Sequence, residues 1–176
     1  MRTLFCLALA ITLCPLVAAA DGKYGGEDRG KPLQPAQVNA NWQQECGSCH
    51  IAYAPGLLPA ESWRKLMSAL DQHFGDDASL TTQENKEITA FLVDNASNRW
   101  SAKTAPLRIT ESLWFKTKHN SREIPPDTWK RPSVKSPANC QACHTGAGKA
   151  DFNEHRIKIP KLITMRISSG TMESSA

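Results

Sequence analysis

The sequence predicts a mostly α-helical protein of two small lobes, with short helices, long loops and little β structure. Three observations support this prediction. Apolar residues recur at helical spacing in several segments, and prolines and glycines interrupt the chain between those segments. One five-residue motif also occurs twice, at residues 46–50 and 140–144, with 94 positions between the two copies' first residues. Each lobe is expected to carry one copy.

The first lobe is expected to span residues 39–105 and to begin with two helices. A short helix from Asn39 to Cys49, with Asn39 as its N-cap and Trp42 facing inward, would carry the first motif. The clearest helical pattern starts near Pro59 and ends at Gly75. Its apolar stripe consists of Trp63, Leu66, Met67, Leu70, His73 and Phe74.

A third helix is expected after the capping-box sequence at residues 81–84, continuing to about Asn95. A polar connection at residues 96–108 leads to the second lobe, residues 106–176. There, Thr110 could cap a helix that ends near His119, and a proline-rich loop follows. The second motif is expected on a short helix starting at residues 136–137, residues 155–159 alternate like a short strand, and the serine-rich end is expected to fray.

The repeated motif has the form Cys-x-x-Cys-His, which is typical of c-type haem attachment. It reads Cys46-Gly47-Ser48-Cys49-His50 and Cys140-Gln141-Ala142-Cys143-His144. Two thiols on one helical turn can reach both vinyl groups of one porphyrin, and the histidine can bind the iron as proximal ligand. The sequence therefore predicts two covalently attached haem c groups.

Cysteine pairs of this spacing also occur in redox-active dithiols and in zinc sites. Four-cysteine zinc modules, however, separate their pairs by about 15 to 20 residues, whereas these pairs lie 94 positions apart. A thioredoxin-like site would need a βαβ pattern, which the sequence does not contain. Neither interpretation explains the histidine after each pair, so haem attachment is favoured.

The sixth ligand of each iron has several candidates. His73 is expected to complete the first iron, while Met67 on the same stripe is the weaker alternative, because methionine there usually fills a core. His119 is expected to complete the second iron. His155 and Met165 remain alternatives for that iron, since the 11 residues from His144 to His155 could span roughly 35 Å if extended.

Residues 1–20 have the pattern of a secretory signal peptide: Arg2, an apolar run and three alanines that end at Ala20. The apolar run is shorter than the roughly 20 residues of a spanning helix, so we expect export to the periplasm without stable membrane insertion. Residues 21–38 should form an extended arm. Cleavage after Ala20 would leave cysteines only in the two motifs, so no structural disulfide is expected.

Charge differs between the two parts of the mature chain. Residues 21–96 hold 6 Lys/Arg and 11 Asp/Glu, a net charge of −5, and residues 97–176 hold 14 and 6, a net charge of +8. Nucleic-acid binding is disfavoured by export. The imbalance either reflects differently solvated faces or steers an acidic redox partner toward the second haem.

The chain resembles the bacterial dihaem cytochrome c family of exported electron carriers. The resemblance covers nearly all of the mature chain and rests on the two motifs, residues 53–59 with Trp63, residues 73–80, Ile109-Thr110 with Trp114 and His119, and residues 157–160. It implies two low-spin haems, ligated by His50 with His73 and by His144 with His119. It also implies electron donation to a small oxygen-binding monohaem cytochrome, sometimes alongside a membrane cytochrome b.

The function expected from the sequence is electron transfer between a membrane or quinol-linked donor and a soluble acceptor. No catalytic residue is expected, because four axial histidines leave no open iron position and no acid and base pair accompanies either motif. A small dihaem peroxidase or reductase with one exchangeable axial ligand is the first alternative. A haem subunit of a larger redox complex is the second.

Overall fold

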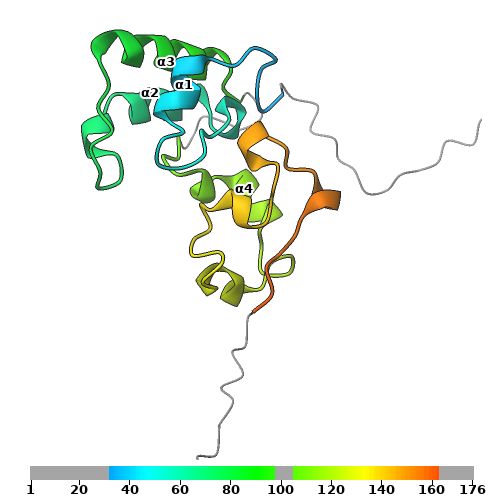
Figure 1. Ribbon diagram of the computed structural model, residues 1–176. Helices are drawn as coiled ribbons and strands as arrows, with labels where there is room; N and C mark the ends of the chain where they lie inside the picture. The colour runs from blue at the N-terminus through cyan, green and yellow to red at the C-terminus, as the bar shows by residue number, and fades with distance from the viewer. Residues whose placement is uncertain (1–31, 98–104, 163–176) are drawn as a thin grey trace, which may run out of the picture.

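The computed structural model describes residues 32–97 and 105–162. Within these ranges the chain forms short α-helices and 3₁₀ turns and contains no β-strand, which confirms the predicted fold class. Figure 1 shows helices α1, α2 and α3 gathered at one end of the molecule, and α4 with most of the later turns at the other. The predicted signal peptide, the first part of the arm and Met165 lie outside the described residues.

Helix α1 (Ala40–Glu45) begins at the predicted cap, because the Asn39 side chain accepts a hydrogen bond from the Trp42 amide at 2.7 Å. Trp42 is buried, as predicted. The helix ends at Glu45, so the predicted extension to Cys49 is wrong. A tight turn follows it: a Cβ atom on Gly47 would lie 2.2 Å from the Gln43 carbonyl oxygen. The first motif occupies this turn.

Helix α2 (Ala60–Met67) is shorter than the predicted helix from Pro59 to Gly75. The Asn85 side chain donates a hydrogen bond to the Met67 carbonyl at 2.9 Å, which satisfies an acceptor at the helix end. The chain continues through the 3₁₀ turn η2 (Leu70–Gln72). His73 therefore lies in a loop and not on a helix face, which corrects the prediction.

Helix α3 (Thr82–Asp94) begins with the predicted capping box, in which Thr81 and Glu84 exchange side-chain and backbone hydrogen bonds. It packs against α1 and α2, and the 3₁₀ turn η1 (Pro55–Leu57) also contacts it. These elements bury an apolar cluster that is drawn entirely from the first described range: Trp42, Leu58, Trp63, Met67, Ile88, Leu92 and Ala96.

The second described range has less regular structure. The 3₁₀ turn η3 (Ile109–Glu111) precedes α4 (Leu113–Lys118), whose N-cap is Ser112 and not Thr110. The Ser112 hydroxyl accepts a hydrogen bond from the Phe115 amide at 3.1 Å. Four further 3₁₀ turns follow: η4 (Pro126–Lys130), η5 (Cys140–Ala142), η6 (Ala147–Lys149) and η7 (Glu154–Arg156). No helix in either described range is long and apolar enough to span a membrane.

The predicted strand at residues 155–159 is wrong. The Asn153 side chain accepts a hydrogen bond from the His155 amide at 2.8 Å and starts η7. The chain that follows has no strand to pair with among the described residues. Instead, the Lys158 amide donates to the Cys143 carbonyl at 2.9 Å, which ties this segment to the second motif. That motif lies on η5, which starts later than predicted.

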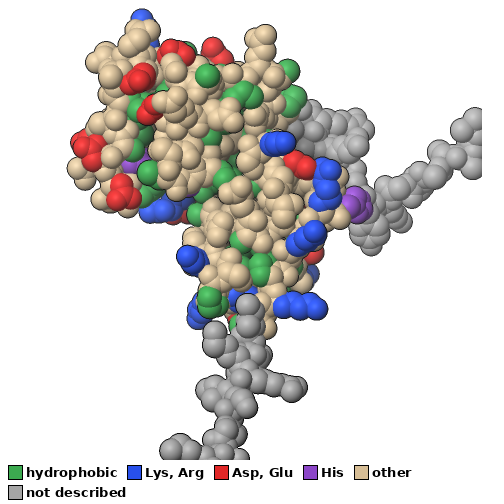
Figure 2. Space-filling model, in the orientation of Figure 1, with side chains coloured by type: hydrophobic (Ala, Val, Ile, Leu, Met, Phe, Trp, Pro, Cys, Tyr) green, Lys and Arg blue, Asp and Glu red, His purple; other side chains and the backbone are tan. Residues whose placement is uncertain are grey.

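The charge imbalance of the sequence becomes a spatial one in the fold. Residues 32–97 hold 3 Lys/Arg and 8 Asp/Glu, a net charge of −5, and residues 105–162 hold 11 and 5, a net charge of +6. Figure 2 shows acidic side chains gathered at the end that contains α1 to α3, and basic side chains over the end that contains α4. The molecule is therefore charged oppositely at its two ends.

Candidate haem sites

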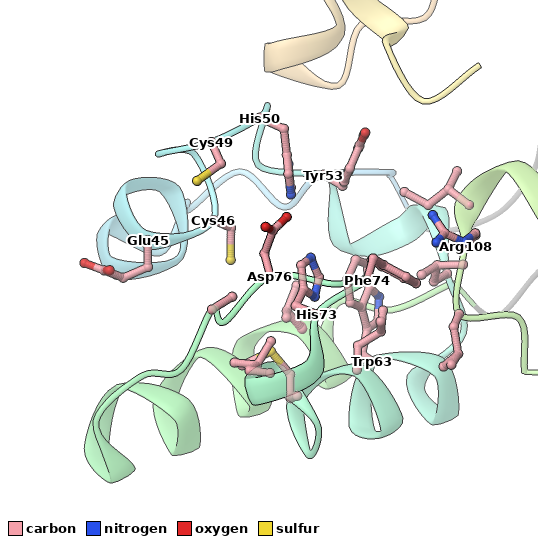
Figure 3. A pocket seen from close by; sticks show the side chains of 18 of the residues that line it. Glu45, Cys46, Cys49, His50, Tyr53, Trp63, His73, Phe74, Asp76 and Arg108 are labelled. Carbon is pink, nitrogen blue, oxygen red and sulfur yellow. The ribbon is translucent and has the colours of Figure 1, made fainter. Parts of the chain in front are cut away.

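The first motif borders a cavity of about 540 Å³, which we call site 1. His50 and His73 line it, and their ring centres lie 6.3 Å apart with the ring planes 25° from parallel. Figure 3 shows the two imidazoles on opposite sides of the cavity, with the thiols of Cys46 and Cys49 nearby. Much of the remaining wall is apolar, from Trp42, Leu58, Trp63, Leu66, Met67, Leu70 and Leu92.

The two histidines of site 1 are held differently. His50 Nδ1 lies 2.7 Å from the Ile51 carbonyl oxygen, which directs its Nε2 atom to other partners. His73 Nδ1 is buried and has no hydrogen-bond partner. Burial lowers the pKa of His73, with a smaller contribution from His50. Its imidazole is therefore favoured in the neutral form that binds metals.

The second motif borders a cavity of about 720 Å³, which we call site 2. His119, at the end of α4, and His144 line it, with ring centres 6.0 Å apart and ring planes 66° apart. Four aromatic residues surround the pair, namely Trp114, Phe115, Trp129 and Phe152. Burial lowers the pKa of both His119 and His144, so both favour the neutral imidazole.

His119 is fixed by its own helix. Its Nδ1 atom lies 3.1 Å from the Phe115 carbonyl oxygen, one turn earlier. Its ring also stacks on the Phe115 ring, with centres 4.1 Å apart and planes 10° from parallel. The hydrogen bond and the stacking together point the Nε2 atom away from the helix.

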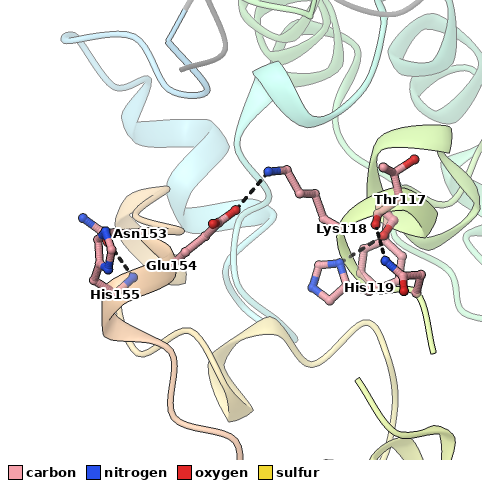
Figure 4. Close-up of polar contacts among 8 residues, drawn as sticks. Thr117, Lys118, His119, Asn153, Glu154 and His155 are labelled. Carbon is pink, nitrogen blue, oxygen red and sulfur yellow. Dashed lines mark hydrogen bonds and ion pairs between the residues drawn. The ribbon is translucent and has the colours of Figure 1, made fainter. Parts of the chain in front are cut away.

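Of the alternative iron ligands, His155 lies outside site 2 and Met67 packs in the buried cluster. His155 is exposed and does not line site 2, and Figure 4 shows its ring beside Asn153, away from His119. The turn that contains it is held beside α4 by an ion pair of 2.9 Å between Lys118 and Glu154. Met67 lines site 1 but belongs to the buried cluster.

The two sites share part of their walls. Ile109, Phe115 and Cys140 line both cavities. Two of the motif thiols are desolvated: burial raises the pKa of Cys140 to about 11, and burial followed by the Glu45 carboxylate raises the pKa of Cys46, which lines site 1 alone, to about 11. We call the three shared residues, Ile109, Phe115 and Cys140, the common wall.

Sequence reasoning did not single out Tyr53 as a site residue. Its ring stacks on His50, with centres 4.9 Å apart. Its hydroxyl donates a hydrogen bond to the Ala138 carbonyl at 2.7 Å, so it links the first site to the chain that enters the second motif. Burial raises the pKa of Tyr53 to about 12, with the Cys140 thiol as a smaller cause. The feature of the sequence that could have identified Tyr53 is its position, since it is an aromatic residue three positions after a motif histidine.

The residues of both sites fit a haem. In each site two thiols and two imidazoles border an apolar cavity whose size lies within the roughly 300–1,000 Å³ of cofactor sites. Because metal–imidazole bonds are about 2 Å long, two rings on opposite sides of one ion have centres about 6 Å apart, as both pairs do. The histidine that the sequence assigns to each iron is the one that faces the motif histidine.

Short helices around two such sites define the class of c-type cytochromes with two haems. The family model for dihaem cytochrome c matches residues 42–152, and the chain belongs to this family. Membership implies two haem groups and a function in electron transfer.

Solved structures agree with this assignment. A diheme cytochrome c from Rhodobacter sphaeroides is 40% identical with a TM-score of 0.61, and the match covers 65% of this chain and 97% of that one. A diheme cytochrome type c from Shewanella baltica OS155 is 41% identical with a TM-score of 0.61, over 69% of this chain and 93% of that one. A search of curated proteins found no match.

Proposed function

We propose that this chain is a periplasmic electron carrier in which Cys46, Cys49, Cys140 and Cys143 attach two haems covalently. His50 with His73, and His144 with His119, would hold the two irons. The facing imidazole pairs are the observation that carries the proposal. With two histidines to hold each iron, neither iron would offer a substrate position, which favours a carrier over a peroxidase or reductase. The predicted leader supports export.

The residues around the sites suit this role. A bound haem supplies one-electron exchange between ferric and ferrous iron. The Phe115 carbonyl and the Ile51 carbonyl orient His119 and His50 through Nδ1 and make them stronger donors to a metal. The four aromatic residues of site 2 surround the imidazole pair and shield part of it from solvent. The common wall gives the two sites contact through protein atoms.

A redox titration of the exported protein, followed by electron paramagnetic resonance, tests the proposal. We expect a mass that includes two haems, two one-electron steps and only low-spin ferric iron. The angle between the two imidazole planes sets the splitting of the iron d orbitals. The near-parallel pair of site 1 should therefore give a rhombic spectrum. The steeply crossed pair of site 2 should give a highly anisotropic signal.

Carbon monoxide separates the carrier from the enzyme. A carrier with four axial histidines should bind it slowly and incompletely when reduced, because a histidine must leave first. Rapid, complete binding at either haem, or a high-spin ferric signal in the oxidised protein, would instead support a dihaem enzyme with an exchangeable ligand.

We further propose that the basic end meets an acidic acceptor, such as a small oxygen-binding monohaem cytochrome, while a membrane cytochrome b or another quinol-linked protein supplies electrons. The net charge of +6 on residues 105–162 supports an acidic partner at this end, since opposite charges raise association rates. Nucleic acid is not a proposed partner.

Salt dependence measures this steering. The second-order rate of electron transfer to an acidic monohaem acceptor should fall as ionic strength rises. Replacing the exposed Lys135, Lys149 and Lys158 with glutamine should lower both the rate and its salt dependence. The control Lys86→Gln, at the acidic end, should leave both unchanged. A rate that does not respond to salt would contradict the proposed acidic partner.

A further inference from the structure

His73 differs from His50 and His119 in what holds its ring. His50 and His119 each have a carbonyl oxygen at Nδ1, at 2.7 and 3.1 Å. His73 Nδ1 is buried with no such partner. Ligating histidines are normally oriented through this atom. Some other contact must therefore fix the direction of the His73 ring.

The loop that carries His73 is a strained turn. The Asp76 amide donates to the His73 carbonyl at 3.2 Å, which closes a four-residue turn. Its two central residues have positive φ angles, 55° at Phe74 and 110° at Gly75. Turns of this kind favour asparagine or glycine at the first central position. A phenylalanine there is unusual, and such a conformation persists where the surrounding contacts stabilise it.

The Phe74 ring contacts His73 on one side and a cation on another. Its ring centre lies 4.9 Å from that of His73, in an edge-on arrangement. The Arg108 guanidinium carbon lies 4.0 Å from the same ring centre. Figure 3 shows Arg108, Phe74 and His73 in succession across the end of site 1. Arg108 comes from the second described range, just before η3, so a distant segment reaches the loop of the ligand.

We propose that Arg108 and Phe74 are positioning residues for His73. The guanidinium holds the Phe74 ring by a cation–π contact, and the Phe74 ring fixes the imidazole that lacks a hydrogen bond. His73 is then the more readily released of the two distal ligands, because its orientation depends on a partly exposed contact. The inference rests on the proposed ligation of the first iron by His50 and His73.

The test measures carbon monoxide binding to the reduced holoprotein, with the haems distinguished by their proton nuclear magnetic resonance signals. Arg108→Leu should raise the rate of binding at the first haem by roughly two- to fivefold, the range that an exposed cation–π contact supports. Arg108→Lys keeps a cation and should restore most of the wild-type rate. Arg108 also lies 4.0 Å from the Glu111 carboxylate, so Glu111→Gln is the matched control and should have no effect.

Phe74→Leu supplies an independent arm, since it keeps a bulky side chain without a π face. It should also raise the rate, and the double variant with Arg108→Leu should add little to either change alone. Additive effects would show that Arg108 acts independently of the Phe74 ring, which overturns the proposal. So would a Glu111→Gln variant that behaves like Arg108→Leu.

His73→Ala separates this proposal from the function on which it rests. If His73→Ala leaves carbon monoxide binding unchanged, His73 is not the ligand, and the proposed ligation fails together with the positioning role. If His73→Ala opens the first haem while Arg108→Leu and Phe74→Leu do not, the ligation stands and only the positioning role is wrong.

Discussion

Replacing Cys140 and Cys143 with alanine is expected to remove one haem and to unfold the end of the protein that contains α4. The buried apolar cluster belongs entirely to residues 42–96. In residues 105–162 the buried hydrophobic side chains are only Phe115, Val134 and Ala147. The aromatic residues of this end, Trp114, Phe115, Trp129 and Phe152, all line site 2. Loss of the group that fills the site should therefore cost more than about 4 kcal/mol of stability.

Mass spectrometry and amide hydrogen exchange check this expectation. The double variant should lose the mass of one haem, and the amides of residues 113–158 should exchange quickly. The matched variant Cys46→Ala with Cys49→Ala should also lose one haem, yet α2 and α3 should keep measurable protection, since Ile88 and Leu92 remain buried against α2. Equal loss of protection at both ends in the two variants would contradict the predicted asymmetry.

His119→Ala is expected to leave the iron of site 2 with a free coordination position. It removes the imidazole 6.0 Å from His144 and leaves the cavity otherwise unchanged. The reduced variant should bind carbon monoxide rapidly and completely at one haem, a change of several orders of magnitude in rate. The oxidised variant should show a high-spin signal in place of the highly anisotropic one.

His155→Ala is the matched control for that experiment. His155 is exposed and lies outside the lining of site 2, so its removal should leave the spectrum and the carbon monoxide kinetics unchanged. A His155→Ala variant that opens a haem while His119→Ala does not would exchange the roles of the two histidines.

The sequence predicts features that depend on neighbouring residues, but it does not predict features that depend on contacts with distant segments. The cap at Asn39 and the capping box at residues 81–84 were predicted correctly, because each depends on residues within one helical turn. The end of α2 was not, because the Asn85 side chain that satisfies Met67 comes from another helix. The apolar spacing continues to Phe74 even though the helix does not.

Distant contacts also determine the geometry of the sites. The His73 prediction assumed a helix face, yet a loop brings the residue opposite His50 all the same. Residues 155–159 alternate like a strand, but alternation cannot supply a pairing partner. Tyr53 and Arg108 act through contacts with residues far along the chain, Ala138 and Phe74, and a single sequence contains no signal for such pairs.

The common wall of Ile109, Phe115 and Cys140 has a consequence for how the molecule stores charge. Each electron adds negative charge to its site, and protein atoms screen that charge less than water does. With both haems bound, an electron on one side of the wall makes the other side harder to reduce. The two haems should therefore be reduced one after the other, and the protein should take up two electrons at two different reduction potentials.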